Sequence, residues 1–288
     1  MSEHQSIDQT ARSTDQSDLN LGPHYVCPDC KIALEDLKCV SCMTQFECRD
    51  GFPVLLSKNS HLDPGSQLGH TYDEIYSNRS EVWADQGRTP EFIAYFASLL
   101  ATLSRGRVLE VGCGEGFLLS AIQSKEKAAI DLSLEALRKT SKRTQGTFSI
   151  ALAERLPFPT GSFDLVVSVG VMEHFIDDRD ATSEIFRVLR AGGRYVALIH
   201  VGTSVSEQLK QKFREYFYPR PRPAAFSRWL FSKVVNPIVQ PIQRAYTEQS
   251  ARLCLEECGF TVSEIISKIR NPNAPLVGPH VLIYIAQK

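Results

Sequence analysis

The chain has 288 residues, of which 43% are hydrophobic and 23% charged, and its formal net charge is −1. This composition is ordinary for a soluble globular protein, and the length allows one large domain plus a small one. The near-neutral charge argues against a surface that binds polyanions generally, and the absence of any run of about eighteen apolar residues excludes a membrane-spanning helix.

Residues 1–22 are predicted to form a disordered tail, because polar residues dominate them and no apolar core of a signal peptide is present. We therefore expect a cytoplasmic protein. In that compartment the eight cysteines are more often metal ligands or free thiols than disulfides.

Two C-x-x-C knuckles, separated by eight residues, dominate the segment 23–57, which we call the leader. Four thiolates at this spacing bind zinc tetrahedrally and leave no open position, so we predict a structural zinc ion. A unit this small cannot fold on its own core, and metal binding would supply folding free energy. Asp50-Gly51 predicts a hairpin turn before a strand. The predicted zinc ligands are Cys27, Cys30, Cys39 and Cys42.

A polar linker is predicted over residues 58–71, before a second domain over residues 72–288. Thr89-Pro90 predicts the start of a helix, which continues at 3.6-residue spacing to Leu103. The segment Arg107–Leu119 then reads as a strand, a tight glycine turn and the opening of a helix. Alternating glycines let a ligand approach the main chain closely, and the helix offers it free N–H groups.

The turn has the spacing G-x-G-x-G, which differs from the G-x-G-x-x-G of pyrophosphate-binding proteins. Further along, Lys127–Asp131 is a second short strand that ends in a carboxylate. In doubly wound sheets an acidic residue at this position binds ribose hydroxyls. These two features together predict a nucleoside-containing ligand.

The motifs in this order resemble the class I S-adenosylmethionine-dependent methyltransferases, in particular the subgroup that includes the ubiquinone/menaquinone-type enzymes. The resemblance covers the chain from about Tyr72 to its C-terminus and implies an α/β fold, a Rossmann-like seven-stranded sheet with helices on both faces. The leader adds a small zinc-ribbon-like unit, similar to those before certain ribosomal RNA guanine methyltransferases. The segments that carry the resemblance are Val108–Gly116, Ile130–Ser133, Ala153–Phe158, Ser162–Ser168, Val171–His174 and Arg187–Gly193.

The resemblance implies S-adenosylmethionine as the methyl donor. Tyr72–Tyr76 is similar to the aromatic segment that related enzymes fold over the cofactor, although a surface helical turn explains it equally well. Leu152 stands where the family usually has the Asp that reaches the adenine amino group, which leaves adenine to backbone groups. The implied cofactor-binding residues are Glu110, Gly112, Cys113, Gly114, Gly116, Asp131, Leu132, Ala153, Glu154 and Ser168.

His174 is the candidate general base, because it follows the fourth strand of the domain, where the methyl-transfer site should open. The Glu-His pair that contains it also recurs in relatives with unlike acceptors, which suits a structural role in the cleft. Both interpretations stay open at this point.

An insertion over residues 205–247 interrupts the family pattern and is too long for a plain loop. It is basic and aromatic, and Phe226–Val235 predicts an amphipathic helix that suits a lid over an apolar acceptor, contact with a membrane surface, or contact with nucleic acid. We favour a small-molecule acceptor that is lipid-like, quinone-like or glycosylated. The alternatives are an RNA methyltransferase that grips RNA with leader and insertion, and a non-catalytic cofactor-binding module. The sequence does not indicate an oligomeric state.

Overall fold

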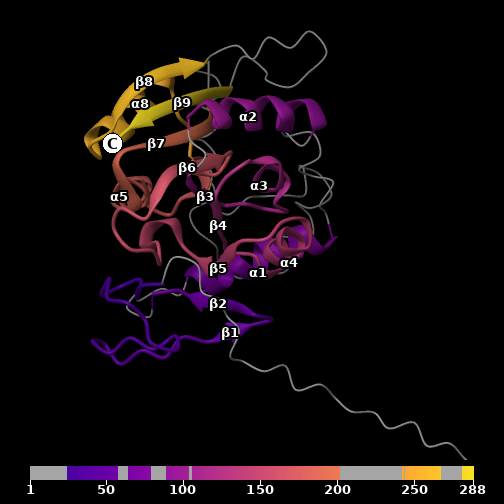
Figure 1. The fold of residues 1–288 in the computed structure, drawn as a ribbon, viewed down its shortest axis with the longest axis vertical. Coiled ribbons are helices and arrows are strands. Elements are labelled where there is room, and N and C mark those ends of the chain that lie inside the picture. The colour runs from indigo at the N-terminus through magenta and orange to yellow at the C-terminus, as the bar shows by residue number, and fades with distance from the viewer. Residues whose placement is uncertain are drawn as a thin grey trace, which may run out of the picture.

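The computed structural model of the chain describes residues 25–57, 64–78, 89–103, 106–201, 242, 244–266 and 281–288. The predicted tail over residues 1–22 and nearly all of the insertion, including the helix predicted over Phe226–Val235, lie outside these residues. Within the described part of the chain, one sheet holds the molecule together (Figure 1).

The sheet has nine strands in the order β1-β2-β5-β4-β3-β6-β7-β9-β8, which Figure 1 shows from β1 at the bottom to β8 at the top. Five neighbouring strands of the domain run parallel: β5 (Thr147–Ala151), β4 (Glu126–Asp131), β3 (Arg107–Val111), β6 (Phe163–Val169) and β7 (Leu189–His200). An antiparallel edge follows, with β9 (Val281–Gln287) beside β7 and β8 (Thr261–Ile266) beside β9.

The predicted count of seven strands is wrong, because the leader contributes two more to the same sheet. β2 (Phe52–Leu55) pairs in parallel with β5, and β1 (Cys48–Arg49) pairs with β2 across the predicted turn at Asp50-Gly51. The seven strands of the domain are present as expected, so the error concerns only where the sheet ends. A strand that pairs with a partner far along the chain carries no local sign of that pairing.

Helices cover both faces of the sheet. One face is packed by α2 (Pro90–Leu103), α3 (Phe117–Ala121) and α4 (Leu134–Arg143), and the other by α5 (Asp178–Val188) and α8 (Glu248–Glu257). Side chains alternate between the two faces along each strand, so Val108 joins the first core and Leu109 the second. The buried leader residues Tyr25, Cys27, Cys39, Phe46 and Leu55 belong to the α5 side.

Helix α1 (Pro64–Asn78) begins inside the range 58–71 that was predicted as a linker. Proline suits the first turn of a helix, where its missing N–H has no partner to lose, so the composition that suggested a linker also starts a helix. The helix brings Leu68, Tyr72 and Tyr76 to the cavity described below. Helix α2 begins as predicted, with the Thr89 hydroxyl accepting a hydrogen bond from the Phe92 N–H at 3.3 Å.

Candidate functional site

A cavity opens at the carboxyl ends of the parallel strands, where the sheet order reverses between β3 and β6. Ligands of doubly wound sheets bind at this kind of switch point. The cavity brings together nine of the predicted site residues: Glu110, Gly112, Cys113, Gly114, Asp131, Leu132, Ala153, Glu154 and His174.

The glycine turn after β3 has the conformation that its spacing predicts. Gly112, Gly114 and Gly116 have φ angles of 68°, 53° and 73°, in the left-handed region that side chains disfavour. At Gly114 a Cβ atom would also lie only 2.8 Å from the Tyr76 hydroxyl, so α1 closes directly over the bare main chain. Gly116 does not line the cavity, and it instead allows α3 to begin against Thr140 of α4.

Asp131 ends β4 beside this turn and fixes its shape. Its carboxylate oxygens accept hydrogen bonds from the Gly114 and Ser133 N–H groups, both at 2.9 Å. Burial raises the pKa of Asp131 to about 6 even though these N–H groups favour the ionised form. Each carboxylate oxygen has a second lone pair, so the group can still accept hydrogen bonds from ribose hydroxyls.

Glu110 is supported less well, by one backbone hydrogen bond from Leu119 and by the nearby Lys127 ammonium. Its side chain is 4% exposed, and its Oε2 atom has no hydrogen-bond partner among the described residues. Burial, with the nearby Asp131 carboxylate as the second cause, raises the pKa of Glu110 to about 8. Two buried carboxyls at one cavity, one of them with an unpartnered oxygen, favour a ligand that brings both positive charge and hydroxyl donors. S-adenosylmethionine carries an ammonium, a sulfonium and a ribose, so the residues present fit it.

The residues after β5 give a mixed result for the adenine side. Ala153 and Glu154 form the short helix η3 (Ala153–Arg155) and line the cavity, as does Leu152. The Glu154 carboxylate accepts hydrogen bonds from the Ile176 and Asp177 N–H groups at 2.7 and 3.2 Å, so it braces the loop before α5. Backbone groups are therefore the available donors and acceptors for an adenine ring.

Besides Gly116, Ser168 is the other predicted residue that does not line the cavity. It is fully buried on the opposite face of β6, and its hydroxyl lies 2.7 Å from the Tyr195 hydroxyl. Val169 and Gly170, which follow it, line the cavity in its place. Successive residues of a strand point to opposite faces of the sheet, so the sequence already placed Ser168 on the other face from Val167 and Val169.

Two imidazoles line the part of the cavity beyond β6 and β7. His174, in the short helix η4 (Met172–His174), has its Nδ1 atom 2.6 Å from the Ile242 carbonyl oxygen. Since only a protonated Nδ1 makes this bond, Nε2 keeps its lone pair. Burial lowers the pKa of His174, so it is neutral at pH 7.

His200, at the end of β7, was not predicted. Its Nδ1 atom lies 2.9 Å from Oε1 of Glu173, which is 3% exposed, and this contact raises the pKa of His200. The other oxygen of Glu173 has no partner among the described residues. Neighbouring parallel strands end at the same edge of a sheet, so a histidine closing the fifth strand was a detectable signal.

The four knuckle cysteines lie together within the leader. All their Sγ atoms lie within 4.8 Å of one another, that of Cys27 lies 3.8 Å from that of Cys42, and all eight cysteines of the chain are free. Tetrahedral zinc with bonds of about 2.3 Å separates its sulfurs by roughly 3.8 Å, so the cluster fits the ion.

Comparisons with known proteins agree with this geometry. Residues 109–197 match the family model described as a methyltransferase domain. The uncharacterized methyltransferase YcgJ of Bacillus subtilis is 33% identical over 45% of this chain and 55% of its own length. A 2-methyl-6-phytyl-1,4-hydroquinone methyltransferase of Oryza sativa is 36% identical over 30% of this chain and 27% of its own length.

A tRNA (carboxymethyluridine(34)-5-O)-methyltransferase of Xenopus tropicalis is 34% identical over 39% of this chain and 18% of its own length. The chain thus spans between about half and a fifth of the length of these relatives. Among solved structures, a chain from the complex between the Haloferax volcanii Trm112 methyltransferase activator and a methyltransferase has a TM-score of 0.53 at 16% identity, covering 75% of this chain and 96% of its own. Residues 109–197 are thus similar to a methyltransferase domain, and the fold around them is that of solved methyltransferase structures.

Proposed function

We propose that this domain transfers the methyl group of S-adenosylmethionine to a small-molecule acceptor. One observation carries the proposal: the glycine turn, Asp131 and the Glu110 carboxyl group, whose Oε2 atom has no partner among the described residues, surround one cavity at the switch point of the sheet. In this assignment Asp131 receives the ribose and the Glu110 carboxylate receives a positively charged group of the cofactor. The non-catalytic alternative would bind the cofactor through the same groups, so only transfer of the methyl group distinguishes it from the enzyme.

When bound, the cofactor supplies a methyl group already activated on its sulfonium. The chain has to hold an acceptor in line with the carbon–sulfur bond, exclude water and, for a hydroxyl or amine acceptor, remove a proton. Alignment alone contributes up to about 7–11 kcal/mol to lowering a barrier. We assign proton removal to Nε2 of His174, because this imidazole is neutral, lines the cavity and has its tautomer fixed by the Ile242 carbonyl.

The lining of the cavity supports an acceptor with apolar surface. Around the two imidazoles lie Phe175, Ile176, Leu198 and Val281, whose side chains offer no hydrogen bonds. We therefore keep the lipid-like, quinone-like or glycosylated acceptor as the proposal. A hydroquinone methyltransferase among the relatives is consistent with it.

Methylation of RNA is the second candidate, and the tRNA methyltransferase among the relatives is the observation that favours it. The basic residues that would grip RNA lie in the insertion over residues 205–247, outside the described part of the chain, as does the predicted contact with a membrane surface. No helix in the described part of the chain is both long and apolar enough to cross a membrane. The predicted cytoplasmic location stays a prediction.

The test combines calorimetry with transfer of a labelled methyl group. S-adenosylmethionine should bind the purified protein with a stoichiometry of one, and the label should then appear in the lipid or small polar fraction of a cell extract. Label in the RNA fraction, together with RNA binding that falls steeply with salt, would establish the second candidate instead. Binding without any transfer would support the non-catalytic module.

A further inference from the structure

The leader touches the domain at the loop that carries the adenine side of the cavity. Its strand β2 lies beside β5, and the loop Leu152–Phe158 follows directly from the carboxyl end of β5. Of the described leader residues, none lines the cavity. Any effect of the leader on a bound cofactor must therefore pass through the elements that it contacts, and this loop is the one that adds three lining residues to the cavity, Leu152, Ala153 and Glu154.

Three polar groups hold the loop from the side of the leader and α5. The Val26 N–H donates to the Pro157 carbonyl at 3.0 Å. The Lys31 ammonium donates to the Leu156 carbonyl at 3.4 Å, and the Arg187 guanidinium donates to the same carbonyl at 3.0 Å and to that of Phe158 at 2.8 Å. Consecutive carbonyls of the loop are thus held by leader and helix together.

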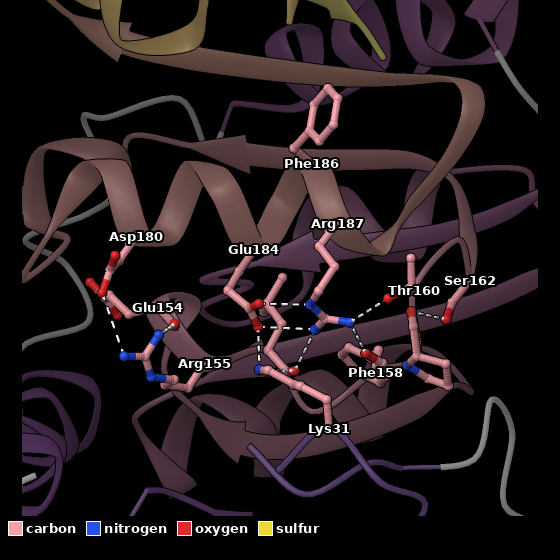
Figure 2. Close-up of polar contacts among 12 residues, drawn as sticks. Lys31, Glu154, Arg155, Phe158, Thr160, Ser162, Asp180, Glu184, Phe186 and Arg187 are labelled. Carbon is pink, nitrogen blue, oxygen red and sulfur yellow. Dashed lines mark hydrogen bonds and ion pairs between the residues drawn. The ribbon is translucent and has the colours of Figure 1, made fainter. Parts of the chain in front are cut away.

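Glu184 joins these two cations, as Figure 2 shows, and we call Lys31, Glu184 and Arg187 together the bracket. Its carboxylate accepts from Lys31 at 2.5 Å and from Arg187 at 2.6 and 2.9 Å, and its side chain is only 10% exposed. Although burial alone would raise it, Arg187 and Lys31 hold the pKa of Glu184 below its ordinary value. The bidentate geometry fixes the direction in which Arg187 points at the loop.

Aromatic packing reinforces the bracket. The Tyr25 ring lies 5.7 Å from that of Phe158, and its buried hydroxyl donates to the Phe148 carbonyl of β5 at 3.0 Å. The loop is therefore held by the leader through its main chain and through its last side chain. A domain without the leader would lose these contacts at once.

From this arrangement we propose that the leader positions the cofactor-binding loop Leu152–Phe158, with Lys31 and Arg187 as positioning residues, so that cofactor affinity depends on the leader. The inference rests on the cofactor assigned above. It gives the leader a role in small-molecule binding that needs no contact between leader and acceptor.

The decisive variant is Lys31→Met, which removes the ammonium and keeps the aliphatic stem, while Glu184 stays paired with Arg187. Calorimetry with S-adenosylhomocysteine should show affinity weakened about three- to tenfold, the effect of losing one partly exposed charged hydrogen bond. Lys31→Arg should restore most of the affinity. Hydrogen exchange of the peptide over residues 152–158 should be faster in Lys31→Met than in the unmodified protein, and unchanged in Lys31→Arg.

Asp180→Asn is the matched control. It removes the ion pair with Arg155, which joins α5 to the same loop without touching the leader and is shown beside the bracket in Figure 2. This control should leave both affinity and exchange unchanged. Equal weakening in Lys31→Met and Asp180→Asn, or no weakening in Lys31→Met, would overturn the proposal.

The unmodified protein supplies a second test that does not depend on how the variants fold. If the leader raises cofactor affinity, linkage requires that the cofactor stabilise the leader. Binding of S-adenosylhomocysteine should therefore slow hydrogen exchange over residues 25–34, although these residues do not reach the cavity. Unchanged exchange there would refute the inference, whereas failure of the unmodified protein to bind at all would refute the cofactor assignment instead.

Discussion

Replacing Glu110 by Gln should separate stability from cofactor binding. The pKa of this buried carboxyl is raised from 4.5 to about 8. At pH 7 the unfolded chain carries the ionised form and the folded chain mostly the protonated form, so the linkage costs about 3 kcal/mol of stability. Because the pKa is raised on folding, the contribution of Glu110 to the free energy of unfolding is fully present below pH 4.5 and is lost as pH rises through about 8.

Glutamine has nearly the same shape and no charge, so Glu110→Gln should remove this pH dependence. Urea unfolding of the cofactor-free protein at pH 5.5 and 7.5 measures it: the stability of the unmodified protein, relative to the variant, should fall by about 2–3 kcal/mol over this range. An unpaired buried amide costs the variant about 1–3 kcal/mol at either pH, which leaves the slope unaffected.

Glu110→Gln should also weaken cofactor binding by about 1.5–3 kcal/mol, because a charged hydrogen bond is lost. A cationic ligand should also drive a proton off Glu110 of the unmodified protein, roughly nine-tenths of a proton at pH 7 for a pKa of about 8. Calorimetry in two buffers with different ionisation enthalpies counts these protons. This prediction would be refuted if the free energy of unfolding changed equally with pH in the unmodified protein and the variant, and if cofactor binding released no proton. Glu110 would then be ionised and paired before the cofactor binds.

Four further outcomes are expected. Elemental analysis should find one zinc per chain, and a folded sample without zinc would remove the Cys27, Cys30, Cys39 and Cys42 site. Asp131→Ala should weaken S-adenosylmethionine binding by about 1.5–3 kcal/mol in calorimetry, and unchanged affinity would place the ribose elsewhere. If His174 takes the proton, the rate of methyl transfer at saturating cofactor should fall only as pH drops below 6.5, whereas a fall under the same conditions that begins above 6.5 would identify His200 as the base. The His200–Glu173 pair should stabilise the fold fully below pH 6.5 and lose this effect as pH rises through the raised pKa of His200. The melting temperature should therefore fall over this pH range, and Glu173→Gln should abolish the fall.

Local pattern was enough to predict the centre of the site. The turn at Gly112–Gly116 and the carboxylate of Asp131 each depend on a few neighbouring residues, and parallel strand ends meet at one edge of the sheet whatever the rest of the chain does. His174 was found for the same reason. The turn, Asp131 and His174 line one cavity, as the strand order requires, and their roles in binding and catalysis stay predictions.

What sequence reasoning missed depends on partners that are distant along the chain. Ser168 was assigned by analogy, although its place on β6 turns it toward Tyr195 rather than toward the cavity. The position of His200 at the end of a strand was a local signal, but its contact with Glu173 depends on the folded chain. The leader was predicted as a separate metal-bound unit, because the sequence of Phe52–Leu55 does not indicate that this strand pairs with Thr147–Ala151.

The parallel pairing of β2 with β5 also sets the order in which the chain can fold as it is synthesised. Val54 must wait for Ile150, which leaves the ribosome roughly 5–20 s later at ordinary elongation rates. During this interval the leader has its cysteines but no sheet to join, and its apolar residues stay uncovered. Nascent chains halted between these two positions should therefore expose the leader to proteases and chaperones, and chains long enough for Arg187 to have left the ribosome should protect it.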